Sequence, residues 1–420
     1  MVSSNAIDDM IEKAVFDSDP QVKQSNRQKI RDLAATRGIS LASIQGLYEA
    51  AARGLFGNRT VPAINIRGLT YPVAKAIFRT ALKHKVGALI FEIARTEMAY
   101  TDQPADEYAV SVLAAAIREG FKGLVFVQGD HFQLNQSKFA LNPREEVKAI
   151  EKTTREAIEA GFLNIDIDSS TLVDLEKPSL DEQQKNNYTV AADVTRFIRN
   201  IEPEGVTISV GGEVGEVGKA NTSVEELRAF MKGYLKRLGA GVKGISKIAV
   251  QTGTTHGGVV LPDGSIADVK LDFKTIEELG KVAREDYGVG GIVQHGASTL
   301  PEEMFELFPK AGTLEVHLAT EFQNIIYDSP YFPKELLDKM YHYITEKYSN
   351  EWKAGDTRDQ FLYKTRKKAF GGFKKETWHL PEEDLAEIIG ILENKFSLLF
   401  QRLNVTNTVN LVNKYCGKPK

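Results

Sequence analysis

The sequence has few cysteines, few tryptophans and no long apolar run. Its 420 residues include one cysteine, Cys416, and two tryptophans. A single cysteine excludes an internal disulfide and a cysteine-based metal site. No apolar run approaches the roughly 18 residues of a membrane span, and the first residues lack the basic-then-apolar pattern of a signal peptide. We therefore expect a cytoplasmic protein with no membrane partner.

The sequence also lacks an excess of charge of either sign. Its 53 basic and 57 acidic residues give a net charge of -4, which gives no reason to expect nucleic acid as a partner. The apolar fraction of 42%, with 34 glycines and 14 prolines, is ordinary for a globular protein. This composition excludes a disordered, collagen-like or coiled-coil chain.

Short β-branched segments alternate with amphipathic segments along most of the chain. The predicted strands are residues 61–68, 87–94, 123–131, 164–170, 207–215, 247–257, 291–298 and 313–322. Apolar residues at three- and four-residue steps predict helices over 72–85, 106–120, 144–161, 188–201, 223–239, 275–286 and 300–312. Eight alternating strands predict a (β/α)8 TIM barrel of the α/β class. A doubly wound sheet is the alternative, but INIRGLTYP after the first strand is not the GxGxxG turn common in that fold.

Helical segments flank the predicted barrel on both sides. We expect an N-terminal helical extension over 1–59, a catalytic barrel over 60–330 and a C-terminal helical extension over 331–420. Such additions more often seal a barrel or form an oligomer contact than carry chemistry. We expect a homodimer or homotetramer.

Polar side chains close several of the predicted strands. The pairs and single residues at these ends include Asp130-His131, Asp168, Glu213, His256 and His295. In a (β/α)8 barrel the active site lies at the carboxyl ends of the strands, so these side chains are expected to meet.

Three of the seven histidines, His131, His256 and His295, occupy such strand ends. Three imidazoles converging on one rim predict a Zn²⁺ site with an open coordination position, as a catalytic zinc requires. Asp168 and Glu213 would orient these ligands or hold a second metal position. A lone histidine here is more often a hydrogen-bonded packing residue, but the joint pattern favours a metal.

Small residues follow two of these histidines. Gly257, Gly296 and Ser298 allow backbone N–H groups to approach an anion closely, and Ser298 adds a hydroxyl donor. Phosphate binding by the loops after the late strands is recurrent in this barrel. The pattern therefore predicts a phosphate site, although glycine also makes ordinary tight turns there.

These motifs together resemble the class II, metal-dependent ketose-bisphosphate aldolases, typified by fructose-1,6-bisphosphate aldolase. The resemblance covers roughly residues 60–325. Its most specific pieces are GDH (129–131), IDSS (167–170), GEVGEVG (212–218), GTTHGG (253–258) and QHGAS (294–298).

The resemblance implies a role for each matching residue. Asp130 would carry the proton on the aldehyde-derived oxygen. The implied metal ligands are His131, His256 and His295, with Glu213 and Asp168 as metal carboxylates. The implied contacts to substrate and to the phosphate of dihydroxyacetone phosphate are Asn65, Gly257, Gly296 and Ser298. The cofactor would be Zn²⁺ or another divalent transition metal, with a monovalent cation beside the phosphate.

Several positions depart from the family pattern. His317 and Ala319 stand where the family has Asn-x-Asp after the last strand, and Arg95 follows Ala94 where a serine usually closes the second strand. We expect Arg95 to bind an anion at the distal end of the sugar, with Arg67 as a neighbouring candidate. A surface ion pair is the competing interpretation.

We therefore expect a carbon–carbon lyase that reversibly cleaves fructose 1,6-bisphosphate, or a related phosphorylated ketose, to dihydroxyacetone phosphate and an aldehyde. One alternative is a different ketose phosphate of the tagatose, sulfo-sugar or deoxy-sugar type. The other is a non-catalytic homologue that binds metal and phosphosugar.

Overall fold

Eight parallel strands close into a barrel in the computed structural model, which describes residues 4–215, 220–253, 261 and 271–418. The barrel strands are β2 (Val61–Asn65), β3 (Ile90–Ala94), β4 (Gly123–Gln133), β5 (Asn164–Asp168), β6 (Ser209–Glu213), β7 (Lys247–Ala249), β8 (Ile292–Gln294) and β9 (Glu315–Leu318). Pairing of β4 with β5 and of β9 with β2 closes the ring. The predicted (β/α)8 barrel is confirmed.

Strand residues are buried on both faces, as expected for a parallel sheet covered by helices. Every residue of β2, β3 and β5 is buried. The outward side chains pack against helices, whereas the inward ones of β5 are Asn164, Asp166 and Asp168, which share one face because strand side chains alternate. The barrel interior is therefore unusually polar.

Helices connect successive strands, as predicted. They are α4 (Thr70–His84), α6 (Ala105–Arg118), α8 (Pro143–Glu159), α9 (Leu180–Ile201), α10 (Val224–Leu238) and α11 (Phe273–Tyr287). Local sequence fixes their starts: Ser223 and Glu226 form a reciprocal capping box on α10. Helix α9 begins eight residues before the predicted 188 because Ser179 caps it there. The predicted helix over 300–312 is instead a 3-10 turn, η2 (Glu302–Glu306), and the short α12 (Leu307–Lys310).

The N-terminal segment contributes α1 (Ser4–Phe16), α2 (Pro20–Thr36) and α3 (Gln45–Ala52), and also a strand that the sequence did not predict. This strand, β1 (Ile39–Leu41), pairs in parallel with the start of β4. It lies outside the closed ring because β4 also pairs with β3 and β5 further along its eleven residues.

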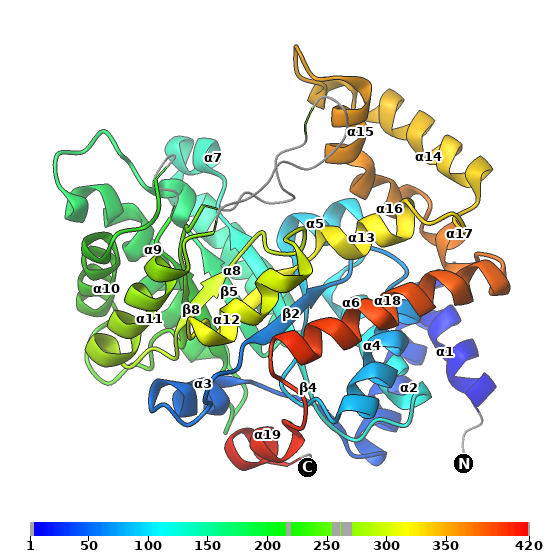
Figure 1. Cartoon of the computed structure of the whole chain (residues 1–420), viewed down its shortest axis with the longest axis horizontal. Helices are drawn as coiled ribbons and strands as arrows, with labels where there is room; N and C mark the ends of the chain where they lie inside the picture. The colour runs from blue at the N-terminus through cyan, green and yellow to red at the C-terminus, as the bar shows by residue number, and fades with distance from the viewer. Residues whose placement is uncertain (1–3, 216–219, 254–260, 262–270, 419–420) are drawn as a thin grey trace.

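The C-terminal segment packs beside the barrel mouth. After β9 come α13 (Thr320–Tyr327), α14 (Lys334–Lys347), α15 (Arg358–Thr365), η4 (Arg366–Lys368), α16 (Ala369–Gly372), α17 (Lys374–Trp378), α18 (Glu382–Arg402) and α19 (Val409–Cys416). Figure 1 shows α14 to α17 gathered at one end of the molecule, near α5 (Arg95–Tyr100) and α13. The long α18 packs on α4.

Strand β4 contains an irregularity at the residues that matter most for the site. Its register with β5 shifts between Gly129 and Phe132, and His131 has a φ of 41°. In a regular strand Asp130 and His131 would face opposite sides of the sheet. The bulge turns the side chains of Asp130 and His131 to the same side, so that both line one cavity.

None of the helices in the described ranges is long and apolar enough to cross a membrane.

Candidate active site

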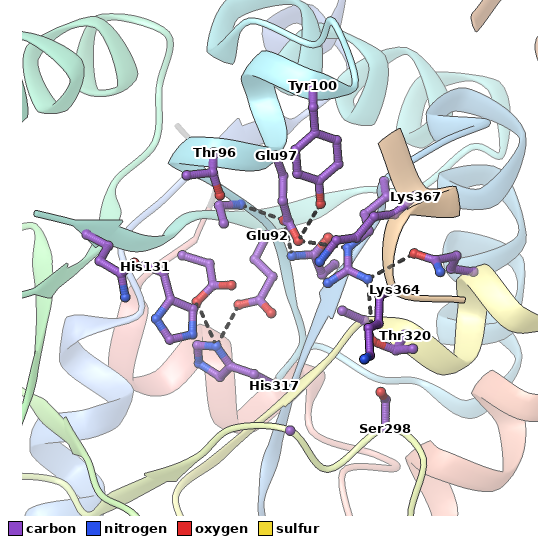
Figure 2. A pocket seen from close by; sticks show the side chains of 18 of the residues that line it. Glu92, Thr96, Glu97, Tyr100, His131, Ser298, His317, Thr320, Lys364 and Lys367 are labelled. Atoms are coloured by element: carbon purple, nitrogen blue, oxygen red, sulfur yellow. Dashed lines mark hydrogen bonds and ion pairs between the residues drawn. The ribbon is translucent and has the colours of Figure 1, made fainter. Parts of the chain in front are cut away.

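A cavity of about 440 Å³ lies at the carboxyl ends of the barrel strands. This volume is within the range typical of small-molecule sites. Five of the residues predicted to form the site line this cavity: Asn65, Asp130, His131, Gly296 and Ser298. Figure 2 shows its side chains converging from the strand ends and from the C-terminal segment.

His131, Glu213 and His295 form a group able to bind a metal ion. One ligand atom from each lies within 4.8 Å of the other two, and the His131 and His295 rings are 4.2 Å apart. They come from β4, the end of β6 and the residue after β8. Two imidazoles and a carboxylate suit a divalent transition metal, because zinc takes nitrogen and oxygen donors when thiolates are absent. The donor set therefore fits the metal that the sequence predicts.

Asp168 fixes the orientation of His131. Its Oδ2 lies 3.0 Å from His131 Nδ1 and accepts a hydrogen bond of 2.6 Å from Gln133 Nε2. Its Oδ1 accepts from the Ser170 hydroxyl at 2.5 Å. Burial raises the pKa of Asp168, but these hydrogen bonds outweigh it and hold the pKa below its usual value. A carboxylate that accepts from one imidazole nitrogen leaves the other nitrogen available to a metal.

The electrostatics of this group are those of a cation site. Burial and, after it, the neighbouring Asp168 together raise the pKa of Glu213 to about 8. Burial lowers the pKa of His131, but Asp130, Asp168 and Glu213 outweigh it and raise that pKa well above the usual value. Neighbouring carboxylates contribute to both shifts, so both groups hold their protons more tightly when no metal is bound.

Two predicted residues, His256 and Gly257, lie outside the described residues. Their roles as a third imidazole ligand and as a phosphate contact remain predictions. Glu213, Asp168 and His295 line a small recess next to the main cavity, together with His131.

His317, in β9, lies beside the metal group and binds Asp130. Its Nδ1 is 3.0 Å from Asp130 Oδ1, and its Nε2 is 2.6 Å from Glu315 Oε1. Its ring centroid lies 4.5 Å from that of His295. The sequence marked His317 as a departure from the family pattern without giving it a role. In the structure His317 contacts both Asp130, the predicted proton carrier, and Glu315 in the barrel interior. Asp130, His295 and His317 also form a second possible group of metal ligands.

A buried polar network lies below His317, and sequence analysis missed it. Lys247 Nζ donates to Gln128 Oε1 at 2.6 Å, to Asp166 at 2.9 Å and to Glu315 at 2.5 Å, and the Tyr48 hydroxyl donates to Glu315. Lys247 is fully buried and already serves as the cation between two carboxylates, so this group needs no metal. The sequence signal for this network was the presence of charged residues in the middle of strands, as in NIDID and FEIA.

Glu92, on β3, borders both this network and the cavity. It is 1% exposed, and its Oε2 lies 3.2 Å from His317 Nδ1. Burial and the nearby Asp130 raise its pKa well above the usual value. Glu92 is therefore a buried carboxyl group that holds its proton more tightly than it would in water.

Asn65 and Arg67 meet Glu97 on another wall of the cavity. Glu97 accepts from Asn65 Nδ2 at 2.6 Å and from Arg67 Nε at 2.7 Å. Arg67 also donates to Gln323 at 3.0 Å. Asn65 is therefore held in place at the cavity surface, and the charge of Arg67 is neutralised by a buried partner.

Arg95 does not line the cavity. Its Nη1 donates to the Gln133 carbonyl at 3.1 Å and lies 3.6 Å from Glu146. Its predicted role in binding a distal anion stays a prediction with no support from this arrangement.

The C-terminal segment supplies a wall that sequence analysis did not anticipate. Tyr363, Lys364 and Lys367 all line the cavity. From the sequence we expected this segment to seal the barrel or to form an oligomer contact. Nothing in FLYKTRKKAFGGFKK indicates which of its basic residues faces the barrel mouth.

Comparison with known proteins agrees with the geometry. The family model described as fructose-bisphosphate aldolase class-II matches residues 43–368. The chain therefore belongs to the class II fructose-bisphosphate aldolase family. No curated protein matches the sequence.

Solved structures share the fold at low identity. A fructose-bisphosphate aldolase (Fba) from Campylobacter jejuni is 17% identical, with a TM-score of 0.54, 88% of this chain covered and 96% of that chain. A probable tagatose 6 phosphate kinase from Sinorhizobium meliloti 1021 is 16% identical, with a TM-score of 0.56 and coverages of 86% and 95%. The fructuronate-tagaturonate epimerase UxaE from Cohnella laeviribosi is 13% identical, with a TM-score of 0.57 and coverages of 90% and 85%. These likenesses establish the fold alone.

Proposed function

We propose that the protein is a metal-dependent aldolase that reversibly cleaves a phosphorylated ketose, fructose 1,6-bisphosphate or a close relative, to dihydroxyacetone phosphate and an aldehyde. The observation that carries this proposal is the grouping of His131, Glu213 and His295 beside Asp130 at the mouth of the barrel. Membership of the class II aldolase family supports it independently.

The metal would be held by His131, Glu213 and His295, with His256 as the further predicted ligand. When bound, a divalent metal supplies Lewis-acid polarisation of the substrate carbonyl. This chemistry needs no Schiff-base lysine, which agrees with Lys247 being occupied by two carboxylates and Gln128.

Asp130 would move the proton of the cleavage step. In the cleavage direction its carboxylate accepts the proton of the C4 hydroxyl while the C3–C4 bond breaks, and it returns that proton in the condensation direction. The hydrogen bond from His317 holds the Asp130 carboxyl group at the cavity surface. Ser298 and the Gly296 backbone would bind the phosphate of dihydroxyacetone phosphate, which orients the ketone.

A related ketose phosphate is the second candidate for the substrate. His317 and Ala319 occupy the strand end where the family has Asn-x-Asp, so the contacts to the sugar hydroxyls differ from the family pattern. A binding-only homologue would have no use for Asp130, which this chain retains.

A retro-aldol assay over a panel of ketose phosphates, with and without a chelator, tests the proposal. We expect release of dihydroxyacetone phosphate from at least one ketose, lost on chelation and restored by Zn²⁺ or Co²⁺. Full activity in protein shown to be metal-free by elemental analysis would overturn it. Because one structural relative is described as a fructuronate-tagaturonate epimerase, the panel includes ketouronates. Interconversion of these without cleavage would assign an epimerase instead.

This proposal also includes a division of the chain into three parts, at residues 1–59, 60–330 and 331–420. It includes a homodimer or homotetramer and a cytoplasmic location as well.

A further inference from the structure

A second group of side chains able to bind a metal ion lies beside the one formed by His131, Glu213 and His295. In this second group Asp130, His295 and His317 each offer one ligand atom, and these atoms lie within 4.8 Å of one another. The three residues are 6–8% exposed. Asp130 and His317 line the cavity, so an ion can reach them through it, and Figure 2 shows His317 close to His131 at one side of that cavity.

His317 is oriented for metal binding in the same way as His131. The Glu315 carboxylate lies 2.6 Å from His317 Nε2 and occupies that nitrogen, so Nδ1 faces Asp130 Oδ1 at 3.0 Å. Asp168 holds the His131 ring similarly, through Nδ1 at 3.0 Å. A carboxylate bound to one imidazole nitrogen fixes the ring and directs the other nitrogen to a metal. The chain therefore builds the same two-residue arrangement twice at this end of the barrel.

The carboxyl groups around His317 Nδ1 favour a cation at that nitrogen. Glu92 Oε2 lies 3.2 Å from Nδ1, so the carboxyl groups of Glu92 and Asp130 both face it. A divalent ion there takes the place of the proton that Nδ1 shares with Asp130. Two imidazoles and a carboxylate are ligands that suit Zn²⁺ and similar transition metals. On the Nε2 side of the ring, Lys247 already supplies a cation, so that side needs no metal.

His295 belongs to both groups, which decides the order in which they fill. Its ring centroid lies 4.2 Å from that of His131 and 4.5 Å from that of His317, whereas those two rings are 6.4 Å apart. The first ion has His131, Glu213 and His295 as ligands. A second ion must share His295 or bind through Asp130 and His317, with water as its remaining ligands. The second ion therefore binds more weakly and enters only at a higher metal concentration.

We infer that Asp130, His295 and His317 form a second divalent-metal site, which fills only after the first one and inhibits cleavage when it is filled. The inhibition rests on the proposed aldolase function, in which Asp130 accepts the proton of the C4 hydroxyl. A carboxylate that serves as a metal ligand has its lone pairs engaged by the ion, so it no longer accepts that proton. The site depends on His317, a residue at which this chain departs from the family pattern.

The experiment counts the Zn²⁺ ions bound per chain. The full chain, freed of metal, is dialysed against buffers of increasing free Zn²⁺ and measured by elemental analysis. We expect two ions per wild-type chain, the second at higher free Zn²⁺, and one ion per chain in His317→Asn. His342→Ala is the control, because His342 lies 3.1 Å from Glu346 on the exposed face of α14, a pair that also attracts surface ions. This control should still bind two ions.

Anomalous diffraction from wild-type crystals at high free Zn²⁺ locates the second ion, and it decides the matter if His317→Asn does not fold. We expect a second peak beside Asp130 and His317. One ion per wild-type chain at every free Zn²⁺ concentration, or a second peak elsewhere, would overturn the site. Retention of the second ion in His317→Asn with its loss in His342→Ala would assign that ion to the surface and overturn the site as well.

Retro-aldol activity over the same Zn²⁺ series tests the inhibition separately. Activity should rise as the first ion binds and then fall about tenfold when free Zn²⁺ is ten times the Kd of the second ion. Full activity with the second ion bound beside Asp130 would overturn the inhibition. If no ketose is cleaved at any Zn²⁺ concentration, the aldolase proposal fails, and the ion counts still decide whether the second site exists.

Discussion

The two sides of the cavity differ in how the chain builds them. The metal side (His131, Asp168, Glu213 and His295) comes from strand ends and brings two carboxyl groups together with two imidazoles. The anion side (Arg67, Tyr100 and Lys367) comes partly from η4, far along the chain, and carries Lys367, which forms no ion pair with any residue that the structure describes. A substrate with a carbonyl at one end and an anion at the other fits this polarity. In the proposed function, the barrel supplies the groups for the chemistry and the added segment supplies one wall of the substrate cavity.

Removal of the metal is expected to have the largest effect, and it acts on the metal side only. Chelation should abolish activity, and His295→Ala should lower metal occupancy by tenfold or more as measured by elemental analysis. The His295→Ala substitution should also remove the stabilisation against thermal unfolding that added Zn²⁺ gives, since a ligand that binds only the folded state stabilises that state. His342→Ala, at an exposed position on α14, is the control. Normal occupancy in His295→Ala would remove His295 from the ligand set.

Replacement of Asp130 separates proton transfer from metal binding. Asp130→Asn keeps the shape of the side chain and should lower kcat by about 10²–10⁴, the range for losing a general acid or base, with metal content near normal. Asp286→Asn, whose side chain pairs with Arg228 at the surface, is the matched control. Loss of metal in Asp130→Asn would instead show that Asp130 supports His131.

Replacement of Lys367 tests the anion side alone. Lys367→Met should raise KM for fructose 1,6-bisphosphate roughly ten- to hundredfold, because a charge-assisted hydrogen bond of about 1.5–3 kcal/mol is lost. KM for fructose 1-phosphate should change little. Lys368→Met controls for the loss of one positive charge from the same segment. Equal losses with both sugars would place Lys367 outside the distal site.

The metal side should respond to pH through Glu213. The pKa of this carboxyl is raised to about 8 without metal, so a proton must leave before it can act as a ligand. Zn²⁺ affinity should therefore increase by at least roughly tenfold per pH unit as pH rises from 6.5 towards 8, because His131, whose pKa is also raised, must lose its proton as well. The part of the increase due to Glu213 should diminish above that pH. Competition with a chromophoric chelator measures this slope. In Glu213→Gln the slope should be shallower by one proton, and an unchanged slope would exclude Glu213 as the titrating ligand.

Arg95 should have the smallest effect. It is bonded to the Gln133 carbonyl away from the cavity, so Arg95→Ala is expected to alter KM for fructose 1,6-bisphosphate by less than about threefold, as for a surface ion pair. Steady-state kinetics of Arg95→Ala, measured alongside those of Lys367→Met, checks this expectation. A larger effect of Arg95→Ala than of Lys367→Met would restore the distal-anion role to Arg95.

The sequence predicted the barrel well because strand and helix periodicities are local properties. Seven of the eight barrel strands lie within predicted segments, and β4 runs two residues past its predicted end at 131. His131, Asp168 and Glu213, from the ends of three neighbouring predicted strands, lie together in the structure. The sequence did not predict strand β1 because its three residues, Ile39–Leu41, are too few to show a periodicity. Its pairing with β4 is a tertiary contact.

The missed parts of the site depend on long-range packing. Lys367 is one of several basic residues in its segment, and only the anchoring of Arg366 and Phe370 decides that it faces the cavity. The network around Lys247 depends on the inward alternation of four strands, which a single strand pattern does not reveal. His317 was visible as a departure, but its bond to Asp130 joins residues 187 positions apart.

The most direct test of the central claim is the position of the metal in crystals of zinc-loaded protein, measured by anomalous diffraction at the zinc edge. We predict a peak at about 2.0–2.2 Å from His131, Glu213 and His295, the usual distance for zinc with nitrogen and oxygen ligands. A peak between Asp166, Glu315 and His317, or no peak near His131 in protein that retains aldolase activity, would contradict it.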